Sequence, residues 1–393
     1  MTALARRSFI GIAKETVQGT YVAPAFYVPI TNPAAADVFA PIRDESFRNN
    51  DTVLQGLYQG PGDSTVGWDM MAYPDAIGYL LRAVIGPDTV TTTGVTTTLS
   101  TNCVAGATSL SLTASVAPNS TIQISDTAGA NLEWVGITTV TGSGPYIATV
   151  TSPSTGTKFA HTAAGGAVVS QSTHTFAQSP TAAQVSYSVT KYDVVVNSGA
   201  TSTRGFPGCK VSELAVKIDP KGAVTFAPKW IGWLSATQPN PTPAFSQLQP
   251  ILGWQWNLTD AGAASTRGLT YDVTLKRTGT EALHTSNGQQ GPREVFQGAF
   301  EADGTLKAIF ESDADLSLFL QYTQMPYVCT LAQPAPSGGM TLTLTHSRAG
   351  LSKGVVDATS AYLAASFDLS AIFNSTDAGA MTATLTNFSS TAF

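Results

Sequence analysis

The sequence predicts a mainly β protein with two short helices, in which one sandwich- or barrel-type domain occurs twice and a small all-β module interrupts the first copy. Three observations carry this prediction. Charged residues make up 12% of the 393 residues, about half of the roughly 25% usual in soluble domains. Short segments alternate between apolar and polar residues, as half-buried strands do. One strand–hairpin–helix pattern also occurs twice along the chain.

The repeated pattern begins with a strand that reads apolar, apolar, Gln, Gly, apolar, aromatic, polar in both copies. We expect a tight turn after it, then a return strand and a helix. The first copy places these four elements at residues 53–59, 61–63, 65–71 and 77–85, and the second at residues 295–301, 303–304, 305–311 and 316–322. Such self-similarity indicates that one folding unit is duplicated.

The spacing between matching segments locates the inserted module. The hairpins repeat at an offset of 242 to 240 residues and the helices at 239, but Phe176-Ala177-Gln178 matches Leu331-Ala332-Gln333 at only 155. The difference of 84 residues equals the length of a Thr- and Gly-rich region that has short strands of its own. We therefore expect residues 1–88 and 173–238 to form the first copy with an N-terminal arm, 89–172 the insert, and 239–393 the second copy.

Each hairpin should have one apolar and one polar face. In the first copy Val66, Trp68 and Met70 alternate with Thr65 and Asp69, so the apolar face can pack on the apolar stripe of the helix. A polar loop precedes each hairpin, and it either touches something outside the domain or is merely solvated. The candidates for outside contacts are Arg43, Asp44, Glu45 and Arg48 in the first copy and Ser286, Asn287 and Gln289 in the second.

Composition and motifs argue against several functions. A net charge of −6 disfavours a protein that grips nucleic acid through its phosphates, because that takes clustered Lys and Arg. Three scattered cysteines are too few for a disulfide framework or a zinc site, and the four histidines lack a second ligand at metal spacing. No nucleophile elbow or phosphate-binding loop occurs. We therefore expect neither an enzyme nor a bound cofactor or metal.

Two further features bear on location and ligands. The apolar run at residues 9–13 is too short for a signal-peptide core or a membrane span, so we expect a chain made and kept in a cytoplasm. Four tryptophans lie around the link between the copies, at Trp230, Trp233, Trp254 and Trp256. They form either an aromatic contact between the copies, which we favour, or a stacking platform for sugars or peptides.

Several segments resemble phage major tail tube proteins of long, non-contractile (siphovirus-type) tails. The resemblance lies in Gly11-Ile12-Ala13-Lys14-Glu15-Thr16-x-x-Gly19-Thr20, in residues 69–86 with their Leu-Leu-x-x-x-Ile-Gly ending, and in residues 208–214 followed by 219–224. It covers nearly all of the chain except the insert, which is similar to β-rich decoration modules of phage virion proteins. It implies a virion protein, assembled in the host bacterial cytoplasm.

In that family, strand pairs from each domain join their neighbours into a closed β-barrel around a channel, the rings stack into a tube, and viral DNA passes through without specific binding. Closure removes the sheet edges that would otherwise aggregate. A polar to acidic lumen would let DNA slide. The lumen candidates on the polar hairpin face are Gln55, Gln59, Thr65, Asp69, Gln297, Glu301, Thr305, Lys307 and Glu311. The plain alternative for this face is an ordinary solvent-facing sheet.

Duplication bears on the symmetry of such a ring. If both copies line the channel, three subunits make a pseudo-sixfold ring, which we favour; if one copy does, six subunits are needed. The expected partners are the chain itself, a tape-measure protein, and tail terminator and tip proteins, and the insert should project from the outside of the tube. The competing function is a secreted or surface β-repeat adhesin that binds glycans.

Overall fold

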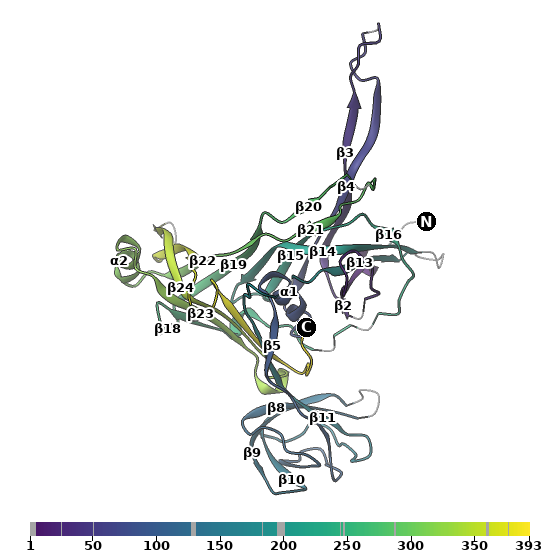
Figure 1. The fold of residues 1–393 in the computed structure, drawn as a ribbon. Helices are drawn as coiled ribbons and strands as arrows, with labels where there is room; N and C mark the ends of the chain where they lie inside the picture. Colours follow the sequence, from purple (N-terminus) through teal and green to yellow (C-terminus); the bar gives the residue numbers. More distant parts are fainter. Residues whose placement is uncertain are drawn as a thin grey trace.

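The computed structural model describes all residues except 1–4, 25, 50, 127–130, 183, 195–200, 244, 247, 287, 359–360 and 376. The chain forms a large β body, a long hairpin arm at one end and a small separate module at the other (Figure 1). Two α-helices lie in the described part of the body. The prediction of a mainly β protein with two short helices is confirmed.

The inner layer of the body is one antiparallel sheet of eight strands in the order β3-β4-β15-β14-β19-β22-β25-β24. Their bounds are β3 Thr31–Asp44, β4 Gly56–Met71, β15 Thr225–Gly232, β14 Thr201–Ile218, β19 Gly268–Thr278, β22 Ala299–Ile309, β25 Ala364–Ala371 and β24 Thr341–Asp357. The first four strands come from the first copy and the last four from the second. The two copies therefore meet edge to edge at the β14–β19 seam.

The outer layer contains the helices and two smaller groups of strands. One group joins β1 (Phe9–Lys14), β2 (Phe26–Val28), β13 (Tyr187–Val194) and β16 (Ala236–Thr237) to the first half of β14. The other joins β17 (Trp256–Asp260), β18 (Ala263–Ser265), β23 (Met325–Ala332) and β26 (Thr382–Asn387) to the first half of β24. Both long strands cross between the layers at a register shift, which lies between Val211 and Glu213 in β14 and between Leu351 and Lys353 in β24. Bulges bend strands in this way.

The strand pairing relates the two copies element by element. Each strand of the first copy has a counterpart in the second copy with equivalent pairing partners. In chain order, the first-copy strands are β1, β2, β3, β4, β13, β14, β15 and β16, and their counterparts are β17, β18, β19, β22, β23, β24, β25 and β26. The match of Phe176 with Leu331 is not part of this correspondence. Phe176 ends β12 (Ser172–Phe176), which pairs with β5 (Asp88–Thr92) and β26, whereas Leu331 lies in β23, the counterpart of β13. Alternating Thr-rich strands look alike, so sequence matching paired the wrong ones.

The turns predicted at residues 61–63 and 303–304 are wrong. β4 and β22 run through these positions without reversing, and Asp303 and Gly304 pair with strands on both sides. The true hairpins are β3–β4 and β19–β22, so the polar loops lie at the tips of the hairpins. The Gly of the repeated strand pattern is Gly298 in the second copy. A larger residue would not fit there, because a Cβ on Gly298 would lie 1.8 Å from the Thr278 carbonyl oxygen.

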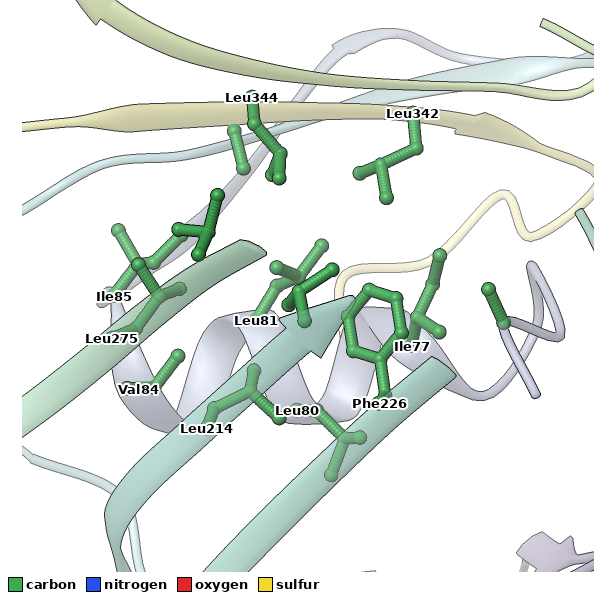
Figure 2. Close-up of a cluster of buried hydrophobic side chains, with 14 of the residues drawn as sticks. Ile77, Leu80, Leu81, Val84, Ile85, Leu214, Phe226, Leu275, Leu342 and Leu344 are labelled. Carbon is green, nitrogen blue, oxygen red and sulfur yellow. The ribbon is translucent and has the colours of Figure 1, made fainter. Parts of the chain in front are cut away.

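Helix α1 (Ile77–Val84) packs on the inner sheet through the apolar stripe that its sequence predicts, while α2 spans Ala314–Leu320. Figure 2 shows Leu80 near Leu214 and Phe226 of the first copy, and Leu275 of the second copy near Ile85 at the end of the helix. Full burial of each such side chain contributes about 1.5–3 kcal/mol. The core is therefore shared across the seam, and one cluster of buried residues spans both copies.

The insert folds around a core of its own. Its antiparallel sheet has the order β6-β11-β8-β9-β10-β7, with bounds β6 Thr96–Thr98, β7 Ser109–Leu112, β8 Ser120–Ser125, β9 Glu133–Thr141, β10 Tyr146–Ser152 and β11 Ala167–Ser170. β5 and β12 pair with each other and form a two-stranded stem that leads to it. Gln171 also donates from Nε2 to the carbonyl oxygens of Gly338 (3.0 Å) and Gly339 (2.9 Å) in the second copy.

Candidate assembly surface

The inner sheet has one face buried under the helices and one exposed polar face. Val66, Val216, Val273 and Leu306 point into the core, and the residues that alternate with them point away from it. The exposed face, called the polar face below, carries Thr65, Asp69, Glu213, Lys217, Lys229, Asp272, Lys276, Glu301, Asp303, Thr305, Lys307, Lys353 and Asp368. It runs across all strands of the inner sheet except β3, where Ala36 and Ala34 stand opposite Thr65 and Gly67.

Charges on the polar face are paired across neighbouring strands. Lys229 lies opposite Glu213 with 2.9 Å between Nζ and Oε1. Lys276 lies between Glu213 and Glu301 in register, and its Nζ is 3.5 Å from a carboxylate oxygen of Asp303. Exposed pairs of this kind contribute about 0–1 kcal/mol each to stability. Their main effect is that the face carries little net charge at any one place.

The same pattern continues toward both ends of the sheet. Lys217 stands opposite Asp272, where burial raises the pKa of the Asp272 carboxyl and the Lys217 ammonium offsets part of that rise. Lys353 stands opposite Asp368, whose Oδ1 accepts a 3.0 Å hydrogen bond from the Thr305 hydroxyl. Lys307 is the exception, since it faces Thr270 and Ser366.

Five of the residues predicted to line a channel lie on the polar face: Thr65, Asp69, Glu301, Thr305 and Lys307. Gln59 lies on the outer half of β4, beyond a register shift, and Gln55 lies in the loop before β4, so neither shares the face. Glu311 is exposed just after β22. Sequence alone did not find the partners on β14, β19 and β25, although 213–217 and 272–276 alternate clearly, because the seam between the copies was not foreseen.

Gln297 is not on the polar face at all. Its side chain is buried, and Nε2 donates to the carbonyl oxygens of Ala83 (2.8 Å) and Val211 (3.2 Å). Arg277 lies beside it and donates to the carbonyl oxygens of Val84 and Ile85, both at 2.6 Å. Burial lowers the pKa of the Arg277 guanidinium to about 10. These two side chains of the second copy therefore satisfy the last carbonyls of α1, which the helix itself leaves unpaired.

The inner sheet ends in two open edges. Among the described residues, β3 pairs only with β4, and residues 350–357 of β24 pair only with β25. The edges lie at opposite ends of the sheet (Figure 1). Unpaired backbone groups on an edge are a template for another strand, so both ends of the molecule invite an additional chain.

The β3–β4 hairpin extends past the body as an arm (Figure 1). Arg43, Asp44, Glu45 and Arg48 lie at its tip, with ion pairs from Arg43 to Glu45 (2.8 Å) and from Arg48 to Asp44. Phe47, between them, is fully exposed. The tip therefore carries charges that neutralise one another around a bare aromatic ring.

The second polar loop lies between β20 (Glu281–Leu283) and β21 (Glu294–Phe296) and runs beside the arm. Gly62 on β4 donates its N–H to the Gln290 carbonyl oxygen at 3.0 Å, and Gln290 Nε2 donates to that of Gly60 at 3.1 Å. Ser286 and Gln289 are exposed in this loop, and Asn287 lies outside the described residues. The loop of the second copy thus supports the arm of the first.

The four tryptophans do not form one platform. Trp230 is buried in β15 and stacks on Trp68 at 6.0 Å, whereas Trp256 stacks on Tyr271 of the second copy at 6.3 Å. Trp254 is exposed by itself. In the described part of the chain no three His, Cys, Asp or Glu side chains gather as metal ligands.

None of the helices described here is long and apolar enough to cross a membrane.

The inner sheet is continuous, its polar face is charge-paired, helices cover its other face, and both of its edges are open to further strands. Residues 5–387 match the family model described as phage tail tube protein, and the chain belongs to that family. No curated protein matches the chain. Membership gives it a structural role in the virion tail, where proteins of this family assemble into a tube.

Proposed function

We propose that the chain polymerises as stacked rings into the tube of a siphovirus-type tail, and that the polar face lines the channel through which viral DNA passes. The observation that carries this proposal is the polar face itself, which runs across both copies while the opposite face is covered by helices. Curling this sheet so that its helices lie outside makes a wall with an apolar middle and a wetted inner surface.

The charge pairing of the polar face suits a conduit for DNA. A protein binds duplex DNA by neutralising phosphates with free Lys and Arg, which releases counterions. On the polar face, Lys217, Lys229, Lys276 and Lys353 each already stand opposite a carboxylate. The phosphates of DNA gain little free energy by displacing these carboxylates from the lysines, so the DNA does not bind to the face.

Three subunits close the ring in this proposal. The seam between β14 and β19 joins two four-stranded halves inside one chain. Joining the β24 edge of one chain to the β3 edge of the next repeats the same kind of joint, so three chains supply six similar sectors. Six chains would be needed if one half of each sheet stayed outside the wall, which the unbroken polar face disfavours.

Contacts between rings are assigned to the arm and the loop beside it. Arg43, Asp44, Glu45 and Arg48 lie at the tip of the arm, at the end of the molecule farthest from the insert, and Ser286 and Gln289 lie in the loop that supports the arm nearer the body. Asn287 belongs to the same expectation but lies outside the described residues. The insert leaves from the outer layer through β5 and β12, so it stands on the outside of the tube. Tape-measure, terminator and tip proteins are the further partners, and assembly takes place in the host bacterial cytoplasm.

Negative-stain microscopy of the purified protein tests the proposal. We expect rings or tubes with a central hole and threefold rather than sixfold averages, each repeat bearing one outer knob from the insert. Particles without a hole would overturn the proposal. A monomer that binds glycans would favour the adhesin alternative, for which Trp230 and Trp256 offer no shared stacking surface, because each is occupied in a separate stack.

A further inference from the structure

Helix α2 is much less buried than its counterpart α1. In α1, Ile77, Leu80 and Val84 are fully buried. In α2, the side chains of Leu316 to Phe319 are only half-buried, Leu320 is 65% exposed, and Tyr322 just beyond the helix is 84% exposed. Both helices pack on the inner sheet of their own copy, so the difference lies in what covers them from outside.

The second copy provides the outer cover of α1. Leu275 of β19 packs against α1 (Figure 2), and Arg277 and Gln297 bind its last carbonyls. The matching elements of the first copy are β3 and the segment before β4. These lie at the other end of the molecule from α2 (Figure 1), so the chain cannot cover its own second helix.

An apolar patch surrounds the uncovered helix. Its members are Leu320, Tyr322, Val356, Tyr362 and Leu363, each more than a third exposed. Val356 belongs to the open edge of β24, on which α2 packs, and it stands opposite the buried Ala365, whereas its neighbour Val355 stands opposite Ser366 on the polar face. Exposed apolar side chains gathered beside an open strand edge mark an interaction site.

We propose that α2 and the β24 edge form a docking site for the β3 edge of a second copy of this chain, which covers α2 as β19 covers α1. The proposal rests on the proposed function, because it names the residues of the joint between neighbouring subunits. The occupant is another molecule of the same chain. The reason is that the β14–β19 seam inside one chain already shows that the two repeated domains fit edge to edge.

The β3 side offers matching chemistry. Ala35 and Phe39 lie on the face of β3 that corresponds to the helix-covering face of β19, and both are half-buried. Val38 and Ile42 add exposed apolar surface along the same strand. The joint uses two different surfaces of the chain, so it is head-to-tail, and such a joint closes into a ring or continues as a filament.

Two single substitutions on α2 test the joint. Leu320→Asp and Tyr322→Asp place a charge in the patch, and both side chains are too exposed to disturb the monomer. We expect each to raise the concentration needed for assembly by about 100-fold, because centrally buried apolar anchors dominate interface affinity. Val104→Asp, at an equally exposed valine of the insert, is the matched control and should assemble like the wild type.

Hydrogen exchange provides a second measurement that needs no variant. Amides at residues 314–322 should be protected in assembled wild-type protein and exchange faster in the monomer, whereas those of α1 should be protected in both. Wild-type rings in which α2 exchanges as in the monomer, or α2 variants that assemble normally, overturn this inference but leave the tube proposal standing. A wild-type chain that never assembles overturns both.

Discussion

Arg277 of the second copy donates from its Nε to the carbonyl oxygen of Val84 in the first copy, at 2.6 Å and in a buried setting. The contact joins two residues 193 positions apart and caps a helix with a side chain from a different folding unit. It adds a polar link to the core that the two copies share. The helix of the first copy is complete only when the second copy has folded against it.

Replacing Arg277 should therefore destabilise the whole body. Arg277→Met keeps the stem but leaves the Val84 and Ile85 carbonyls without a donor, and we expect a loss of about 2–4 kcal/mol in the free energy of unfolding. Urea denaturation of monomeric protein measures it. Arg43→Met, at an arginine that is mostly exposed, should change the value by less than about 0.5 kcal/mol. Equal effects of the two substitutions would contradict the assigned role.

His346 should make the protein less stable in mild acid. Burial lowers the pKa of His346 to about 4, and its Nδ1 lies 3.0 Å from the Tyr271 hydroxyl. In the unfolded chain the pKa is about 6.5, so between these values the unfolded state binds the extra proton. Stability is complete above about pH 6.5 and falls by up to about 3 kcal/mol as the pH drops to about 4. The unfolding free energy of His346→Gln should not show this fall.

His174 should act in the opposite direction. It lies between Asp88 (Nδ1 to Oδ2, 2.9 Å) and the Ser389 carbonyl oxygen (Nε2, 2.9 Å). Burial lowers the pKa of His174, but these hydrogen bonds and the Asp88 charge outweigh it, so the pKa is raised. Its stabilisation is complete below the unfolded pKa of about 6.5 and is lost as the pH rises through the higher folded value.

Urea titrations of His174→Gln against the wild type between pH 5 and 9 check this prediction for His174. The difference in unfolding free energy should be largest at the acid end. A difference that grows toward alkaline pH would show that the bond network favours the neutral ring.

Reversing three charges should turn the polar face into a DNA-binding surface. Glu301→Lys, Asp303→Lys and Asp368→Lys together remove two of the three carboxylates beside Lys276 and the one opposite Lys353, and they add three cations. We expect salt-dependent binding of duplex DNA, visible by fluorescence anisotropy, where the wild type binds none. The same exchange at Glu45, Asp51 and Glu281, which lie in or beside the hairpin loops, controls for net charge. Equal binding by both variants would show that the face has no special role.

The insert should be removable without unfolding the body. Thr92 and Thr173 pair directly across the β5–β12 stem, so a short turn can join the two strands once residues 93–171 are deleted. We expect the shortened chain to keep the thermal transition of the body, because the two cores are separate. It should also form tubes of unchanged channel width. A cut inside the module, at residues 105–150, should instead leave a damaged and aggregating fragment.

Duplication and face polarity could be predicted from the sequence because both depend on local patterns. The alternation of Val66, Trp68 and Met70 with polar neighbours needs only the two-residue period of a strand. The pairing of β14 with β19 depends on contacts between residues far apart in the chain, and no local pattern encodes it. The match of Phe176 with Leu331 failed for the same reason, since an alternating sequence pattern indicates a strand but not the strand with which it pairs.

Gln297 shows the limit for single residues. By position it belongs to a polar strand face, and its counterpart Gln55 lies in an exposed hairpin tip. Only the three-dimensional structure shows that Gln297 turns inward to the end of α1. A polar residue in a strand pattern can cap the end of a helix or face solvent, and the residue type alone does not distinguish the two roles.

The internal pairing of charges on the polar face has a consequence for the medium around it. Because Lys229 and Glu213, or Lys276 and its carboxylate neighbours, neutralise one another within the chain, the face recruits few mobile ions from solution. Dilution or concentrated salt therefore changes its electrical character little, in contrast to a surface of one sign that is strongly screened by salt. In the proposed channel, DNA would therefore meet nearly the same charge on the wall at low and at high salt.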